Sequence, residues 1–359
     1  MYTVRPLREL RAADFDTVPI LRATVKASRR LAELKGVAAS IPNQAILINT
    51  LSLQEAKDSS AIENIVTTHD ELFRTASLID AGITPAAKEV RDYILALNRG
   101  FHVVRSNSLL TNSVINEVQA TLEGNDAGFR TLPGTVLKDI RGRTVYTPPQ
   151  NPQEIVDLMT DLEAFINDDS FDADPLVKMA IIHHQFESIH PYYDGNGRTG
   201  RIINVLYLAL HEVLDIPVLY LSRQIVRTKR DYYRLLQHVR DTGDWEEWIL
   251  YMLLGVEKTA GETISTINAI HATLLDYKHR IRARYRFYSQ DLVNNLFQHP
   301  YTKIDFVMRD LDVSRLTATK YLERLTTDGF LVKHRSGRSN YYMNAGLVEV
   351  LLRVEDDSG

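Results

Sequence analysis

The chain has 359 residues, of which 44% are hydrophobic, and this supports two or three ordinary globular domains. Its formal net charge of −4 does not point to nucleic acid or to a membrane surface. The absence of cysteine excludes disulfides, thiolate metal sites and a cysteine nucleophile. We expect a cytoplasmic protein without a signal peptide or a membrane span, because no window approaches the roughly 18 apolar residues that a span needs.

Apolar residues recur at steps of three and four along most of the chain, which predicts a mainly α-helical protein. Two stretches, 134–149 and 330–343, break this pattern and predict β-hairpins. The composition changes near Ser289. We therefore predict three parts: an N-terminal helical segment over 1–110, a helical core over 111–288 and a separate module over 289–359.

The twelve residues His-Pro-Tyr-Tyr-Asp-Gly-Asn-Gly-Arg-Thr-Gly-Arg, at 190–201, form a polar loop that leads from one predicted helix, 175–187, into the next. Gly195 and Gly197 allow successive backbone N–H groups to turn toward one point. The following helix N-terminus adds its partial positive charge. The loop is therefore suited to phosphates, and a triphosphate is the expected ligand.

The side chains of this loop supply the groups that nucleotidyl transfer requires. Arg198 and Arg201 are planar cationic donors, and Asn196 is a neutral amide. Asp194 is a hard oxygen ligand for Mg²⁺, and His190 is a base that titrates near neutral pH. Such transfer depends mainly on positioning and charge neutralisation, so these groups are sufficient.

This run resembles the signature of Fic-domain proteins: histidine, proline, an aromatic residue, two residues, Gly-Asn-Gly-Arg, two residues and arginine. Tyr192 stands where phenylalanine is commoner. The resemblance implies a helical Fic core that transfers AMP from ATP to a Tyr, Thr or Ser hydroxyl of a protein. Modification of the chain by itself stays open. It implies that His190 deprotonates the hydroxyl and that Asp194 holds Mg²⁺. The ATP-binding residues it implies are Gly195, Asn196, Gly197, Arg198, Thr199, Gly200, Arg201, Tyr232 and Tyr233.

The first hairpin is similar to the flap of this family. Its edge would pair with an extended target segment and align the acceptor hydroxyl beside His190. Tyr232 and Tyr233 resemble paired tyrosines that lie along the nucleotide, and core packing is their alternative role. Arg240 occupies the position at which some relatives have an asparagine that contacts the nucleotide. The flap residues expected to dock the target are Arg143, Thr144, Val145 and Tyr146.

Residues 59–64, Ser-Ser-Ala-Ile-Glu-Asn, resemble the inhibitory helix motif of this family and lie in a predicted helix, 48–64. The resemblance implies that Ser59 and Glu63 are inhibitory residues. Glu63 would pair with Arg201 and withdraw its guanidinium from the γ-phosphate, since such charge-assisted bonds are strong. In some relatives the same glutamate assists the removal of AMP, so a hydrolytic activity is an open alternative for this chain. A homodimer is open as well.

The segment from 280 to 340 holds twelve Lys and Arg residues against six Asp and Glu residues. A predicted helix over 304–311, a turn, a second helix over 315–327 and the second hairpin together resemble a winged helix-turn-helix domain. Such a domain binds DNA in some proteins and docks proteins in others, and both alternatives stay open. The residues available for DNA are Arg315, Thr317, Thr319, Lys320 and Arg324 on the second helix, with Arg335 and Arg338 on the wing.

Three functions therefore compete. The chain is a protein adenylyltransferase, a transferase of another nucleotide-derived group such as UMP or phosphocholine, or a DNA-binding regulator whose Fic fold is a sensor. The intact His190, Asp194, Asn196 and Arg198 favour an enzyme. His183 and His184 are expected to be structural, because adjacent helical residues diverge by about 100° and no third metal ligand is evident.

Overall fold

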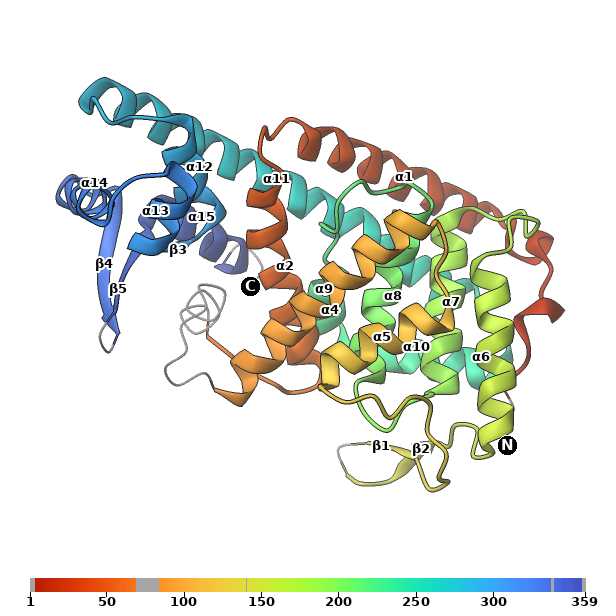
Figure 1. The fold of residues 1–359 in the computed structure, drawn as a ribbon. Helices are drawn as coiled ribbons and strands as arrows, with labels where there is room; N and C mark the ends of the chain where they lie inside the picture. The colour runs from red at the N-terminus through yellow and green to blue at the C-terminus, as the bar shows by residue number, and fades with distance from the viewer. Residues whose placement is uncertain (1–3, 69–83, 140, 337–338, 357–359) are drawn as a thin grey trace. The chain divides into compact units, whose positions relative to one another are not determined.

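The computed structural model describes residues 4–68, 84–139, 141–336 and 339–356. Helices dominate, which confirms the mainly α-helical prediction (Figure 1). The chain forms two compact units. Unit 1 consists of Met1–Ala32, Asp58–Ile65 and Asp92–Ala260, and unit 2 consists of Glu33–Lys57, Val66–Arg91 and Gly261–Gly359.

Four long helices each contribute residues to both units. The predicted helix at 48–64 is α2 and begins three residues earlier than expected, because Asn43 accepts a hydrogen bond from the N–H of Ala45. Two 3₁₀ turns, η1 (Leu7–Glu9) and η2 (Ala12–Phe15), precede the first long helix. The long helices are α1 (Val18–Ala39), α2 (Ala45–Ile62), α4 (Pro85–Asn107) and α11 (Glu246–Arg284).

Shorter helices make up the rest of unit 1, and α7 is the central one among them (Figure 1). It packs against α6 and α8, and α5 packs against α6 and α8. All residues of α7 from Leu176 to its end are buried, including polar residues such as His183 and Glu187. The helices are α5 (Asn112–Glu123), α6 (Pro152–Ile166), α7 (Pro175–Ile189), α8 (Asn196–Leu210), α9 (Leu221–Arg227) and α10 (Lys229–Thr242).

The first predicted hairpin is confirmed as an antiparallel pair, β1 (Leu137–Lys138) and β2 (Thr144–Tyr146). Leu137 lies opposite Tyr146 and Lys138 opposite Thr144, so β2 has one extra residue, a bulge at Val145. The two strands form a sheet of their own, so each has one edge that no other strand covers in the described part of the chain.

The C-terminal part of unit 2 has the element order predicted for a winged helix. The helices predicted at 304–311 and 315–327 have those bounds, and the second hairpin is confirmed. Its sheet has the strand order β3-β5-β4, and β3 is a two-residue strand that the sequence did not predict. Its elements are α12 (Gln290–Gln298), β3 (Tyr301–Thr302), α13 (Ile304–Leu311), α14 (Arg315–Thr327), β4 (Leu331–Ser336), β5 (Ser339–Asn344) and α15 (Ala345–Asp356).

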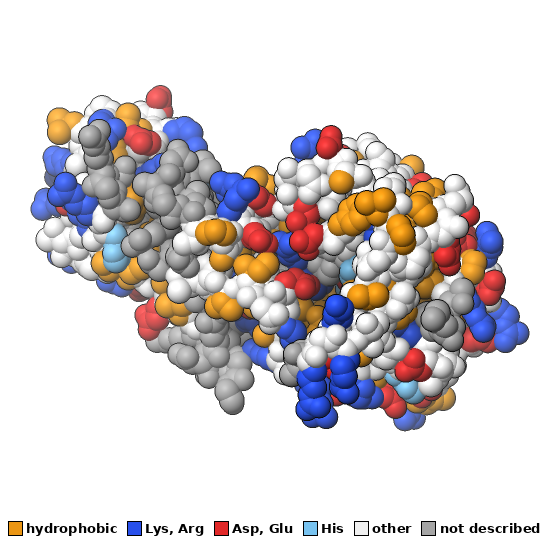
Figure 2. Space-filling model, turned by 90° about the horizontal axis from the view of Figure 1, so that it is seen from below, with side chains coloured by type: hydrophobic (Ala, Val, Ile, Leu, Met, Phe, Trp, Pro, Cys, Tyr) orange, Lys and Arg blue, Asp and Glu red, His pale blue; other side chains and the backbone are white. Residues whose placement is uncertain are grey.

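Basic and acidic side chains both appear on the face shown in Figure 2. Among the described helices, none combines the length and apolar character that crossing a bilayer requires.

Candidate active site

His190 lies directly after α7, in the left-handed backbone conformation with φ 50°. A histidine rarely adopts this conformation, and such residues concentrate at functional sites. The His190 N–H donates to the Phe186 carbonyl at 2.9 Å, which closes the last turn of α7. Arg130 Nε donates to the His190 carbonyl at 2.9 Å, and the Arg130 N–H donates to the Pro191 carbonyl at 2.8 Å. The backbone of His190 is therefore fixed from both sides.

The surrounding protein desolvates the His190 imidazole and lowers its pKa to about 4. The positive charges of Arg240 and Arg130 contribute to the same lowering. Since the group is neutral at pH 7, it is able to accept a proton. A bound polyphosphate would oppose these positive charges and raise the pKa toward the range of an effective base.

Helix α8 begins at Asn196, directly after Gly195, which has φ 75°. Gly195 has no side chain to cap this N-terminus, and the first N–H groups of a helix have no partner within the helix, as an anion site would require. The Asn196 side chain closes the loop, because it donates to the Tyr192 carbonyl and accepts from the Tyr192 N–H, both at 2.8 Å. The phosphates are therefore expected to meet the backbone of the loop rather than this amide.

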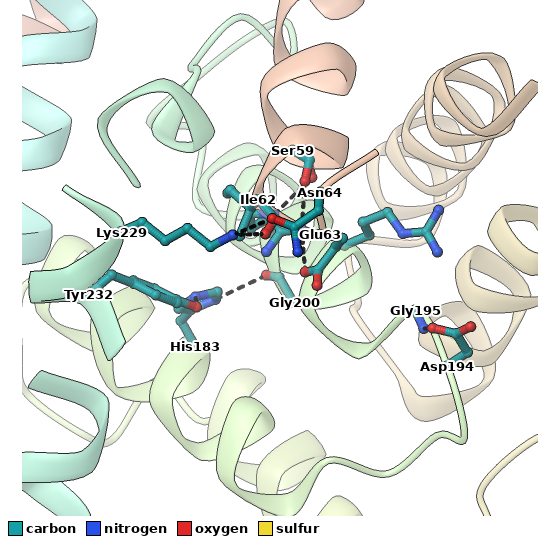
Figure 3. Close-up of polar contacts among 12 residues, drawn as sticks. Ser59, Ile62, Glu63, Asn64, His183, Asp194, Gly195, Gly200, Lys229 and Tyr232 are labelled. Carbon is teal, nitrogen blue, oxygen red and sulfur yellow. Dashed lines mark hydrogen bonds and ion pairs between the residues drawn. The ribbon is translucent and has the colours of Figure 1, made fainter. Parts of the chain in front are cut away.

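Asp194 is exposed and precedes this helix start. Its Oδ1 accepts the Gly195 N–H at 2.7 Å, which orients the carboxylate (Figure 3). In the described residues, no group of three or more His, Asp or Glu side chains converges on a metal position. Asp194 still fits Mg²⁺, because this ion is often held by one or two carboxylates together with substrate phosphates and water.

Arg201, which is 2% exposed, lies one turn into α8 and binds the end of α2. Its Nε donates to Ser59 Oγ at 2.8 Å, and its Nη2 lies 3.1 Å from Glu63 Oε1. Figure 3 shows Ser59 and Glu63 together at this end of α2. A Cβ on Gly197 would lie 2.4 Å from Glu63 Oε1, so the carboxylate occupies the space directly against the first turn of α8. The structure thus brings together the residues of both sequence motifs.

The end of α2 is held in place by cations from two neighbouring helices. Lys229 Nζ donates to the Ile62 carbonyl at 2.5 Å and to Asn64 Oδ1 at 3.1 Å (Figure 3). A lysine at this position also suits the partial negative charge of a helix C-terminus. Arg223 Nε lies 3.2 Å from Asp58 Oδ2. No sequence pattern predicts these contacts, which hold Glu63 in position.

Arg198, which is 4% exposed, contacts a residue that sequence reasoning missed. Its Nη2 donates to Glu123 Oε1 at 2.8 Å. Thr199 and Gly200 belong to the same first turns of α8, and both are buried. Gly200 lies against α7, because a Cβ there would be 2.8 Å from Glu187 Oε1.

The two predicted tyrosines have different environments. Tyr232 is 1% exposed, and its hydroxyl lies 2.8 Å from His183 Nε2 (Figure 3), which corresponds to the core-packing alternative. Tyr233 is 47% exposed and is available to a ligand. His183 and His184 are both buried, and burial lowers the pKa of His183 to about 3. Their environment agrees with a structural role.

The flap is attached to the last turn of α7. The Tyr146 hydroxyl donates to the Ser188 carbonyl at 2.7 Å, and the Arg240 guanidinium lies over the Tyr146 ring at 3.9 Å. Arg240 Nε also donates to Ser188 Oγ at 3.0 Å. The Tyr146 side chain is therefore an anchor, whereas Arg143, Thr144 and Val145 are exposed. Arg240, at the position where some relatives place an asparagine, ties the flap to the segment before His190.

Three family models match the chain. The Fic/DOC family N-terminal model matches 21–102, the Fic/DOC family model matches 109–208, and the model for the C-terminal domain of the SoFic-like protein adenylyltransferases matches 274–347. This chain belongs to the Fic family. The prediction from the loop at 190–201 is thereby confirmed.

Curated Fic relatives match about half of the chain. Protein adenylyltransferase fic-1 of Caenorhabditis elegans is 23% identical over 209 residues, which is 54% of this chain and 40% of the relative. Protein adenylyltransferase Fic of Culex quinquefasciatus is 30% identical over 195 residues, 52% of this chain and 37% of the relative. The chain thus spans well under half the length of these relatives.

Solved structures show the same fold. A Fic family protein from Desulfovibrio desulfuricans G20 superposes with a TM-score of 0.59 at 20% identity, over 92% of this chain and 97% of that one. Residues 134–508 of C. elegans Fic-1 superpose with a TM-score of 0.52 at 20% identity, over 71% of this chain and 74% of that one. At these identities the likeness concerns the fold.

Proposed function

We propose that this chain transfers AMP from ATP to a hydroxyl group of a protein. The observation that carries the proposal is the placement of a neutral His190 six residues before Asn196, the first residue of α8, where Arg198 and Arg201 are buried. This loop combines a base with a cationic phosphate cradle. The names of the curated relatives support the same activity.

In the proposed reaction, His190 takes the proton of the target hydroxyl as its oxygen attacks the α-phosphorus of ATP. The bond from the α-phosphorus to the bridging oxygen breaks, and pyrophosphate leaves. The first N–H groups of α8, with Arg198 and Arg201, stabilise the charge that collects on the phosphates. Asp194 would hold Mg²⁺, which neutralises phosphate charge when it is bound.

We assign Glu63 the role of an intramolecular inhibitor. Its carboxylate lies against Gly197 and pairs with Arg201, so it occupies the place where a terminal phosphate would meet the cradle. ATP must displace it or bind in another pose. The contacts of Lys229 with the end of α2 keep the carboxylate in this position.

The target segment is proposed to add to the flap as an extended strand. The flap has an uncovered edge in the described structure, and Tyr146 fixes it beside the end of α7. Main-chain pairing of this kind would place an acceptor hydroxyl near His190 without dictating the target sequence.

DNA binding by the C-terminal part stays a prediction. Arg315 Nη1 lies 3.0 Å from Asp305 Oδ1, and Lys333 pairs with Glu323, so part of the positive charge is neutralised within the module. Lys320 and Arg324 are exposed on α14. Arg338, predicted to contact phosphate from the wing, lies outside the described residues.

The proposal is tested by mass spectrometry of the purified Glu63→Gly protein after incubation with ATP and Mg²⁺. We expect a gain of one AMP mass on the chain or on an added target, because Arg201 is released for the phosphates. The same protein with His190→Ala is the control and should gain nothing. The absence of AMP from the Glu63→Gly protein and from all targets offered would refute the proposal, and a gain that persists in the control would refute the role of His190.

A further inference from the structure

One face of α5 holds the loop that follows α7. The Tyr192 hydroxyl donates to Asn116 Oδ1 at 2.7 Å, and Tyr192 is fully buried. Gln119 Nε2 lies 3.4 Å from the Asp194 carbonyl, which is a long hydrogen bond. Asn116 and Gln119 are three residues apart, so they share one face of the helix.

The same face of α5 ends in Glu123, four residues after Gln119. Glu123 Oε1 accepts from Arg198 Nη2 at 2.8 Å, and the two side chains are only 13% and 5% exposed. A Cβ on Gly195 would lie 2.2 Å from the same oxygen. The carboxylate therefore packs directly against the glycine loop, and only glycine leaves room for it there.

We propose that Glu123 is a positioning residue that orients Arg198 to bind the phosphates of a nucleoside triphosphate. This inference rests on the proposed function, since it concerns the same phosphate cradle. A guanidinium has five N–H donors in a rigid, planar fork, so fixing one of them on Glu123 sets the direction of the others. Because Arg198 is already oriented, less side-chain conformational entropy is lost when the ligand binds.

The environments of Glu123 and Glu63 distinguish their roles. The Glu63 side chain is 36% exposed and reaches α8 from the end of α2, so a ligand is able to displace it. The Glu123 side chain is 13% exposed and belongs to a helix that also holds Tyr192. Removing a partner from a buried ion pair leaves an uncompensated charge, so Arg198 is expected to stay paired during binding.

The test compares the Glu63→Gly protein with the same protein carrying Glu123→Gln, which keeps the shape of the side chain and removes its charge. We expect calorimetry to show binding of Mg²⁺-ATP weakened about tenfold, because a misdirected Arg198 loses a charge-assisted hydrogen bond to phosphate, and such a bond contributes about this much. The KM for ATP should rise accordingly, with a much smaller change in kcat. Glu117→Gln on the same helix is the matched control and should change neither value, because Glu117 pairs with Arg99.

Thermal unfolding measures the cost of leaving Arg198 without its charged partner, and we expect a lower Tm for the Glu123→Gln protein; the positioning role is measured by the binding of Mg²⁺-ATP to the folded protein. Should Glu123→Gln not fold, Glu123→Asp keeps the charge but shortens the reach to Arg198, and the same rise in KM is expected. Unchanged or tighter binding of Mg²⁺-ATP would overturn the inference, and tighter binding would mean that Glu123 competes with phosphate. Binding without any AMP transfer would refute the proposed function alone, because the orientation of Arg198 is measured by binding.

Discussion

Removing the charge of Glu63 should increase the affinity for ATP. Arg201 Nη2 lies 3.1 Å from Glu63 Oε1, and the two side chains are 1% and 36% exposed. A hydrogen bond to a charged group contributes about 1.5–3 kcal/mol when it is shielded. Solvent screens the exposed part of Glu63, so we reduce this to about 1–2 kcal/mol. ATP should therefore bind about 5- to 30-fold more tightly to Glu63→Gly.

Isothermal calorimetry with Mg²⁺-ATP measures this change, in a His190→Ala background that prevents turnover. Glu63→Gln should lie between the parent and Glu63→Gly, because it keeps a hydrogen-bond acceptor but carries no charge. Glu247→Gln is a suitable control, since Glu247 pairs with Arg234 and is 59% exposed. Equal affinities across the series, or weaker binding by Glu63→Gly, would show that Glu63 does not compete with the nucleotide.

Two further predictions concern stability. Burial raises the pKa of Glu187 to about 7. The protonated group therefore contributes its full stability at pH values below about 4.5, and this contribution is lost as the pH rises through 7. Glu187→Gln should be more stable than the parent by on the order of 3 kcal/mol at pH 8 and by under about 1 kcal/mol at pH 5. Urea unfolding at the two pH values checks this, and an equal difference at both would contradict it. A Cβ on Gly100 would lie 2.8 Å from both Leu206 Cδ1 and Val118 Cγ2, so Gly100→Ala should destabilise the protein by about 1–3 kcal/mol. An added Cβ on Gly36 in α1 meets nothing within 4 Å, so Gly36→Ala should stabilise the protein by about 0.5–1 kcal/mol. Thermal unfolding measures both glycine variants, and a higher Tm for Gly100→Ala than for Gly36→Ala would refute this account of the packing.

The sequence predicted the parts of the site that are local in the chain. The loop at 190–201 carries its glycines, arginines and histidine within twelve residues, so its pattern alone indicated a phosphate cradle. The helices at 304–311 and 315–327 were predicted with their observed bounds, because Asp312-Val313-Ser314 indicates a turn; in the structure Ser314 also caps the second helix.

Contacts between distant segments could be predicted only where a resemblance marked both partners, as for Glu63 and Arg201, which lie 138 residues apart. Glu123 lies 75 residues before Arg198, and Arg130 lies 60 residues before His190, and neither belongs to a pattern in the sequence. Strand β3 has two residues and exists because it pairs with β5. Tyr232 shows the same limit, since helical spacing could not distinguish a buried ring from one that faces a ligand.

The central claim is that the α-phosphorus of ATP is transferred, and radiolabelled ATP tests it most directly. The Glu63→Gly protein is incubated with Mg²⁺ and either [α-³²P]ATP or [γ-³²P]ATP, alone and with candidate target proteins. We predict protein-bound label from the α-position only, and its loss in the His190→Ala variant. Label from the γ-position would show phosphoryl transfer instead, and no label from either position would contradict the proposed function.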